Sequence, residues 1–231
     1  MTAAIDRRTP HSRLDEASGS ATSSRASLGF RDGDKGVHSS RTMMFDELSL
    51  LLEHATPTST MDDFRRLAVS DNVLAKPTRT TREHTVRKLK ALYGLDPSLP
   101  LFRALVRLWP LDPPSRPLLA LLVATARDPL LRLVLPPVLE IADGAPIHAE
   151  FVREPLARLT DGRFSETNLS AIATRVLSTL TQSGHLVGKL DKHRAPPHAT
   201  PINAALALFI AYLDGLRGHS LFDSFWASLL G

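Results

Sequence analysis

The hydrophobic positions of this chain recur at helical spacing from Phe45 almost to the C-terminus. Apolar residues three and four positions apart form one face of a helix, and the alternation that indicates strands is nearly absent. Capping Ser and Thr residues, together with Gly and Pro at helix ends, divide this pattern into separate helices. We therefore predict an all-α, mainly helical fold with helices that begin near residues 45, 62, 81, 101, 118, 129, 151, 166, 202 and 220.

One segment interrupts the helical pattern. A helix that starts after Ser165 and runs to about residue 182 is followed by residues 185–195, a short basic stretch interrupted by Gly188. Such a stretch predicts two brief strands around a turn. A helix followed by a basic hairpin is the outline of a winged helix-turn-helix. We thus expect two helix-turn-helix or winged-helix-like modules, with at most a short β-hairpin wing, over residues 42–144 and 145–231.

Residues 1–41 differ from the rest, because they are rich in Ser, Thr, Arg, Gly and Asp and show no sustained periodicity. A segment of this composition cannot bury enough apolar surface to order itself, so we predict a disordered N-terminal tail over residues 1–41. Met43 and Met44 lie where the periodic sequence begins. Translation that starts there, without the tail, remains an alternative.

Composition narrows the class of protein. The 231 residues carry a net charge of +4 and include no cysteine. They contain no Walker-type glycine loop, no Gly-x-Ser-x-Gly and no His-Glu-x-x-His motif, and His148-Ala-Glu150 lacks the cysteines of a zinc deaminase. The most apolar run, residues 117–126, is well short of the ~20 residues that span a bilayer. We expect a non-enzymatic cytoplasmic protein without membrane insertion, metal or cofactor.

Positive charge is concentrated in two places. Between Lys76 and Lys90 there are six Lys or Arg residues against the single carboxylate of Glu83. A helix start at Thr80 or Thr81 places this excess on a short helix suited to a DNA groove. The predicted contacts to double-stranded DNA, mainly to phosphates, are Lys76, Arg79, Thr80, Thr81, Arg82, Arg87, Lys88 and Lys90 on this segment, and Lys189, Lys192 and Arg194 on the hairpin.

The order of several short motifs resembles the BrxA family, a small component of bacterial BREX phage-exclusion systems. The motifs are Asn72-Val-Leu-Ala-Lys-x-Thr-Arg-Thr-Thr, Val86-Arg-Lys-Leu, Ala126-Arg-Asp-Pro-Leu-Leu, Phe164-Ser-Glu-Thr-Asn, Ser183-Gly-His-Leu-Val and Pro196-Pro197. They lie within residues 43–231. The resemblance implies a small helical protein with helix-turn-helix-like modules that binds double-stranded DNA and works beside other BREX subunits in antiviral defence.

Two other functions remain open at this stage. The first is a protein–protein adaptor whose apolar C-terminal residues dock a larger defence subunit. Its candidate docking residues are Leu221, Phe222, Phe225, Trp226 and Leu229, which could equally pack on the chain's own core. The second is a sequence-specific transcription regulator, for which footprinting would find one protected operator. Few Asn or Gln residues occur in the candidate helices, so we expect little base specificity.

Overall fold

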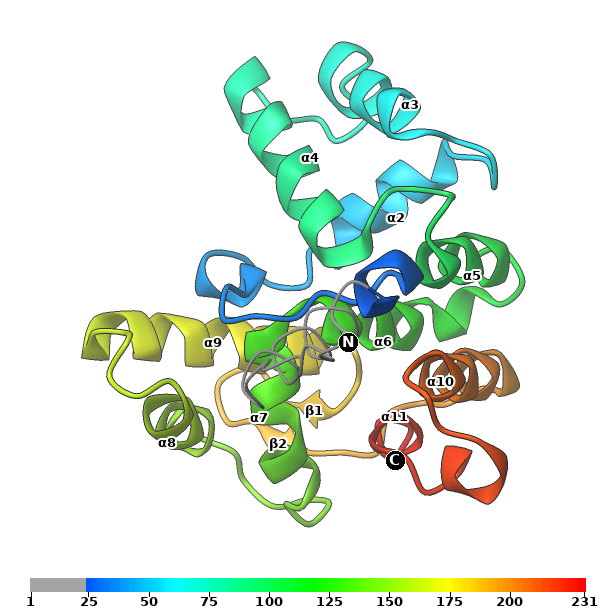
Figure 1. The fold of residues 1–231 in the computed structure, drawn as a ribbon. Coiled ribbons are helices and arrows are strands. Elements are labelled where there is room, and N and C mark those ends of the chain that lie inside the picture. Colours follow the sequence, from blue (N-terminus) through cyan, green and yellow to red (C-terminus); the bar gives the residue numbers. More distant parts are fainter. Residues whose placement is uncertain (1–23) are drawn as a thin grey trace, which may run out of the picture.

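The structure is a computed structural model, and it describes residues 24–231. Their regular secondary structure is helical apart from one two-stranded hairpin, which confirms the predicted all-α class (Figure 1). The helices are α2 (Phe45–Glu53), α3 (Met61–Arg65), α4 (Arg79–Tyr93), α5 (Pro100–Leu108), α6 (Arg116–Arg127), α7 (Pro129–Leu139), α8 (Glu150–Leu159), α9 (Glu166–Gln182), α10 (Pro201–Leu213) and α11 (Phe225–Ser228). Shorter turns are η1 (Val37–Ser39), η2 (Arg66–Ser70, a π-helical turn), η3 (Pro113–Ser115) and η4 (Gly218–Leu221), and the hairpin strands are β1 (Leu186–Val187) and β2 (His193–Arg194).

Helix α6 is the centre of the core, because every residue from Leu118 to Ala126 is buried. Helices α4, α5, α7 and α10 all pack against it. Burial on every side explains why this helix is apolar all round, as the sequence predicted. Since α10 also packs on α5, the core continues across the predicted module boundary at residue 144. No helix within residues 24–231 is long and apolar enough to cross a bilayer.

The C-terminal half has the winged-helix order α7, α8, α9, β1, β2 (Figure 1). The two strands pair antiparallel, and Pro146 forms a further antiparallel bridge with His193, which places β2 in the middle. The amide of Ile147 donates to the Lys192 carbonyl at 2.8 Å. The turn between the strands depends on Gly188, whose φ is +96° and which has no room for a side chain against the backbone of Asp191.

The predicted disordered tail, residues 1–41, falls into two parts with different outcomes. Residues 1–23 lie outside the described residues, but residues 24–41, which we call the N-terminal strap, are ordered, and for them the prediction of disorder is wrong. Residues 24–28 are helical, and Phe30 and Val37 are buried in the core. The strap runs between α4 on one side and α7 and α9 on the other (Figure 1). The periodicity argument missed it because only a few of its residues are apolar.

A buried polar cluster fixes the strap. The imidazole of His38 contacts the Asp128 carboxylate through Nδ1 at 2.8 Å and the Thr179 hydroxyl through Nε2 at 2.9 Å. Asp128 also caps α7, accepting from the amides of Leu130 and Leu131. Burial raises the pKa of Asp128, but the His38 ring, the His38 backbone amide and the Leu131 amide hold it below its ordinary value overall. The cluster joins three elements that are far apart in the sequence.

Two predicted helix boundaries change. The cap of α4 is Thr78, whose hydroxyl accepts from the Thr81 amide, rather than Thr80 or Thr81. The helix predicted from about residue 220 to 230 is broken into η4 and the short α11, because the Ser224 hydroxyl caps a new start. The predicted caps Thr60 and Ser165 are confirmed.

Candidate nucleic-acid interface

Two of the predicted DNA contacts, Lys76 and Arg82, hold the loop that leads into α4. The Arg82 guanidinium donates to the carbonyls of Val69 and Lys76, each at 3.0 Å. The ammonium of Lys76 lies 2.9 Å from a carboxylate oxygen of Glu47 on α2. Both side chains therefore fix the loop before α4, a structural role that the sequence did not predict, and their predicted DNA contact stays a prediction.

The exposed side of α4 carries the remaining predicted contacts. Arg79 pairs with Glu83 at 3.1 Å, so part of its charge is balanced locally. Thr81 is half-buried against the cap residue, whereas Thr80 is exposed. Arg87 and Lys90 are exposed and Lys88 is half-buried, and none of the three forms an ion pair with a carboxylate of residues 24–231. These three cations are the unbalanced part of the predicted cluster.

The hairpin supplies fewer exposed cations than the sequence predicted. Arg194 is 5% exposed and turns inward, where its guanidinium donates to the carbonyls of His185 and Ala195. Lys192 donates to the Thr181 hydroxyl at 2.8 Å. Of the three predicted hairpin contacts, only Lys189 is exposed. The hairpin also lies on the opposite side of the molecule from α4 (Figure 1), so the two basic segments do not form one surface. The predicted phosphate contact by Arg194 is wrong.

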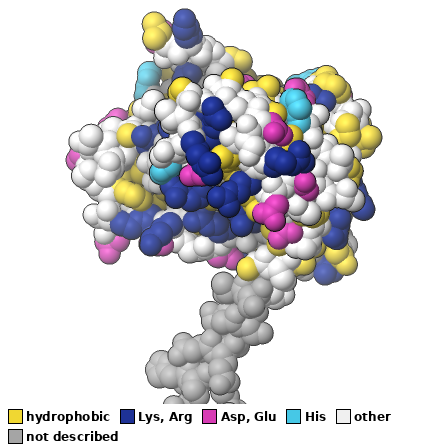
Figure 2. Space-filling view, turned by 90° about the horizontal axis from the view of Figure 1, so that it is seen from above, with side chains coloured by type: hydrophobic (Ala, Val, Ile, Leu, Met, Phe, Trp, Pro, Cys, Tyr) yellow, Lys and Arg dark blue, Asp and Glu magenta, His cyan; other side chains and the backbone are white. Residues whose placement is uncertain are grey.

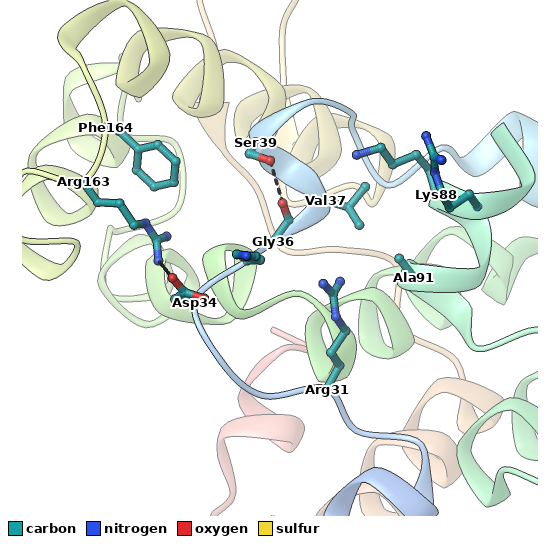
Figure 3. A pocket seen from close by; sticks show the side chains of 11 residues that line it. Arg31, Asp34, Gly36, Val37, Ser39, Lys88, Ala91, Arg163 and Phe164 are labelled. Carbon is teal, nitrogen blue, oxygen red and sulfur yellow. Dashed lines mark hydrogen bonds and ion pairs between the residues drawn. The ribbon is translucent and has the colours of Figure 1, made fainter. Parts of the chain in front are cut away.

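A different set of residues joins Arg87 and Lys88. Between α4, the strap and the turn before α9 lies a cavity of about 480 Å³, which we call the basic cavity. Five of its lining residues are cationic and one is acidic, and Figure 3 shows most of their side chains. The charged residues are Arg31, Lys35, Arg87, Lys88, Arg163 and Asp34. Lys and Arg side chains also gather on the face of the molecule that carries α3 and α4 (Figure 2).

Electrostatics show how closely these cations are grouped. Burial lowers the pKa of Lys88, and the positive charges of Arg87, Arg41 and Arg31 lower it further. Within residues 24–231, the only ion pair in the basic cavity joins Arg163 to Asp34 at 2.9 Å. The other four cations of the cavity have no carboxylate partner among the described residues, so an incoming anion would meet an excess of positive charge.

The sequence prediction missed five cationic residues around this cavity. Arg31, Lys35 and Arg41 belong to the strap that was assigned to disorder. Arg163 comes from the turn before α9, and Arg175 on α9 donates to the Ser39 carbonyl at 2.8 Å. None of them forms a local charge run, so only the ordering of the strap could have revealed them.

One other polar group has the residue types of a nucleophilic site. Thr179, His38 and Asp128 form a hydroxyl–imidazole–carboxylate chain, but all three side chains are 0% exposed. The Thr179 hydroxyl also accepts from the Met43 amide at 3.0 Å. This chain therefore holds the strap in place. Within the described part of the chain no three His, Asp or Glu side chains form a metal-binding group.

The basic cavity can hold anionic groups by charge and by hydrogen bonding. Arginine presents several N–H donors in a plane that matches phosphate oxygens, and lysine adds a compact point charge. No protein-family model matches this chain, and no curated protein is significantly similar to it.

Proposed function

We propose that this protein binds double-stranded DNA, largely independently of sequence, through the exposed side of α4 and the adjoining basic cavity. The observation that carries the proposal is the group of cations on α4 and the strap that have no carboxylate partner within residues 24–231. Unpaired Lys and Arg side chains on one face are the electrostatic footprint of a phosphate-binding surface.

The helical framework favours DNA over other polyanions. Helix α4 follows α3 and η2 across a short loop, and its exposed Thr80, His84 and Arg87 lie at positions i, i+4 and i+7 on one side. A second helix after a turn, with its polar side open, is the arrangement that enters a DNA groove. Polar uncharged residues also dominate the exposed side of α9, including Thr167, Asn168 and Thr174. The fold thus offers two helices of suitable form.

The test is a mobility-shift titration with a blunt duplex at low and raised salt. Binding should weaken with a log–log slope of roughly −0.9 for each neutralised phosphate. Arg87→Glu should weaken binding roughly tenfold and flatten the slope by about one. Arg107→Glu is the matched control, because Arg107 is also an exposed helical arginine but lies on α5 outside the basic cavity.

Two outcomes would overturn the proposal. The first is the absence of duplex binding even at low salt. The second is an equal loss of affinity in Arg87→Glu and Arg107→Glu, which would show a general charge effect. Arg82 is left unchanged in this experiment, because replacing it would release the backbone carbonyls that it holds.

We further propose that this DNA binding serves a BREX-type phage-exclusion system. The support is the order of the motifs between residues 43 and 231, which resembles the BrxA family. Gene neighbourhood tests it: genes for a large ATPase, a methyltransferase and a phosphatase-like protein should lie beside the gene for this chain. Their absence would remove the defence role and leave the DNA-binding proposal standing.

The adaptor alternative keeps little of its predicted surface. Trp226 and Leu229 are buried, and Leu221 and Phe225 are half-buried against the core, so four of the five candidate residues pack on the chain itself. Only Phe222, at 62% exposure, remains open. An adaptor would bind a defence subunit equally well in the wild-type protein and in Arg87→Glu, which a pull-down can measure.

A further inference from the structure

The basic cavity is lined by apolar as well as cationic residues, whereas contact with a duplex backbone requires only the cations. Beside its cations it has an apolar part, made by Val37 of the strap, Ala91 of α4 and the aromatic ring of Phe164. In Figure 3 the Phe164 ring stands on the side of the cavity opposite Lys88, with Val37 and Gly36 between them. Phosphates alone would be recognised by cations without an aromatic wall, so the wall points to a ligand with a flat apolar part.

We propose that the basic cavity binds a single unpaired nucleotide unit, with its phosphate beside Arg31 and Lys88 and its base beside Phe164. This inference rests on the proposed DNA binding and names the part of the nucleic acid that this site takes. A base that has left the stack can lie on an aromatic ring or on the plane of an arginine guanidinium. The Arg163 guanidinium covers one face of the Phe164 ring at 4.5 Å from its centre, so a base would stack on the other face of the ring or on the outer face of this guanidinium.

The phosphate end is defined by Arg31. One guanidinium nitrogen of Arg31, Nη1, is buried and has no hydrogen-bond partner within the described residues. A buried donor without an acceptor costs free energy, and a turn of the Arg31 guanidinium toward the cavity would let a phosphate oxygen accept from it. In Figure 3 the guanidinium of Arg31 points up toward the space below Val37, and Lys88 extends from α4 toward the upper side of Val37.

Asp34 limits which anion can enter. Its carboxylate is paired with Arg163 at 2.9 Å, so the charge of Arg163 is balanced and its guanidinium plane is held over Phe164. The phosphate is therefore expected at the Arg31 and Lys88 side, away from Asp34. The volume of about 480 Å³ lies within the range of pockets that hold ligands of this size, roughly 300–1,000 Å³.

A nucleotide of this chemistry could come from an unpaired position in DNA or from a free nucleotide. The test uses the fluorescent base 2-aminopurine in three ligands: a duplex with a one-nucleotide overhang of 2-aminopurine, the same duplex with 2-aminopurine inside a base pair, and the free 2-aminopurine monophosphate. Stacking on Phe164 should quench the overhang or the free nucleotide at least twofold more than the paired base. Quenching of the free nucleotide alone would assign the site to free nucleotides, and quenching of the overhang would assign it to DNA.

Variants separate stacking from folding. Phe164→Tyr keeps the ring and should retain the quenching, whereas Phe164→Leu keeps the apolar volume and should lose it. Blunt-duplex affinity should stay within about twofold in both, because Phe164 contributes no charge. Equal quenching in all three ligands, or the same quenching in Phe164→Leu as in Phe164→Tyr, would overturn the inference. If the blunt duplex itself does not bind, the proposed function fails first, which distinguishes the two failures.

Discussion

The two basic segments of this protein carry similar side chains but use them differently. On α4, Arg87 and Lys90 extend into solvent with no carboxylate partner among residues 24–231. On the hairpin, Arg194 is buried under the backbone of residues 185 and 195, and Lys192 is bound to Thr181. The difference arises from the surroundings: the Arg194 guanidinium is enclosed by two hairpin carbonyls and lies 3.7 Å from the Asp143 carboxylate, whereas Arg87 and Lys90 have no such acceptors beside them among the described residues. A Lys or Arg side chain is available to an outside ligand only where backbone carbonyls do not already accept from its donors.

The largest expected effect is on the hairpin. Arg194→Met should lower the free energy of unfolding by about 3 kcal/mol, because it removes a buried charged donor from two carbonyls. Urea unfolding measures this, with Lys189→Met as the exposed control on the same hairpin. Duplex affinity of the folded variant should be unchanged. A variant that is fully stable but binds DNA weakly would mean that Arg194 reaches DNA after all.

The hairpin should also make the protein sensitive to acid. Burial lowers the pKa of His185 to about 4, and the charge of Arg194 contributes to this shift. In the unfolded chain the pKa returns to about 6.5, so below that pH the unfolded state binds a proton that the folded state does not. His185 therefore supports the fold fully above pH 6.5, and its support is lost as the pH falls toward 4.

Lowering the pH from 7 to 5 should therefore lower the free energy of unfolding by about 2 kcal/mol. The measurement is urea unfolding at several pH values for the wild type and His185→Gln. The difference between the two proteins should shrink as the pH falls. Parallel curves across this range would show that His185 does not stay neutral in the fold.

A smaller effect is expected at the base of α4. Arg82→Met should lower the free energy of unfolding by about 1 to 2 kcal/mol, because the Val69 and Lys76 carbonyls lose a donor. Blunt-duplex affinity should stay within about twofold, in contrast to Arg87→Glu. Thermal or urea unfolding and a mobility-shift titration on one preparation measure both quantities. Equal loss of affinity in the two variants would support the predicted DNA contact of Arg82.

The smallest effect is expected at the tip of the hairpin. Lys189→Ala should change stability by less than about 0.5 kcal/mol, because the side chain is exposed and makes no ion pair within residues 24–231. On a short duplex its affinity should also stay within about twofold, since the hairpin lies away from α4. Lys88→Ala is the comparison on the other segment. A Lys189→Ala effect as large as that of Lys88→Ala would extend the interface to the hairpin.

Local sequence signals predicted most of the fold. The apolar stripe of α9, with Leu169, Ile172 and Val176 facing inward, and the capping residues Thr60 and Ser165 act within a few positions of one another. Such signals need no knowledge of the rest of the chain. The same holds for the hairpin, because its turn requires the glycine at residue 188.

The site was less predictable, because its parts come from distant places in the chain. The strap is held by His38 on Asp128 and Thr179, which are 90 and 141 positions away. Arg31 and Lys35 become part of the cavity only through that attachment. Charge counting also assigned Arg82 and Arg194 to DNA, since it cannot show which cations face backbone carbonyls. Sequence reasoning thus identified the basic helix and missed the other walls of its cavity.

The strap has a consequence for where a working polypeptide can start. A product translated from Met43 would carry every helix from α2 to α11 yet lack Arg31, Lys35 and Arg41. It would also leave the carboxylate of Asp128 and the hydroxyl of Thr179 buried without their imidazole. Such a shortened version should be both less stable and poorer in positive charge, so the choice of start codon would set two properties at once.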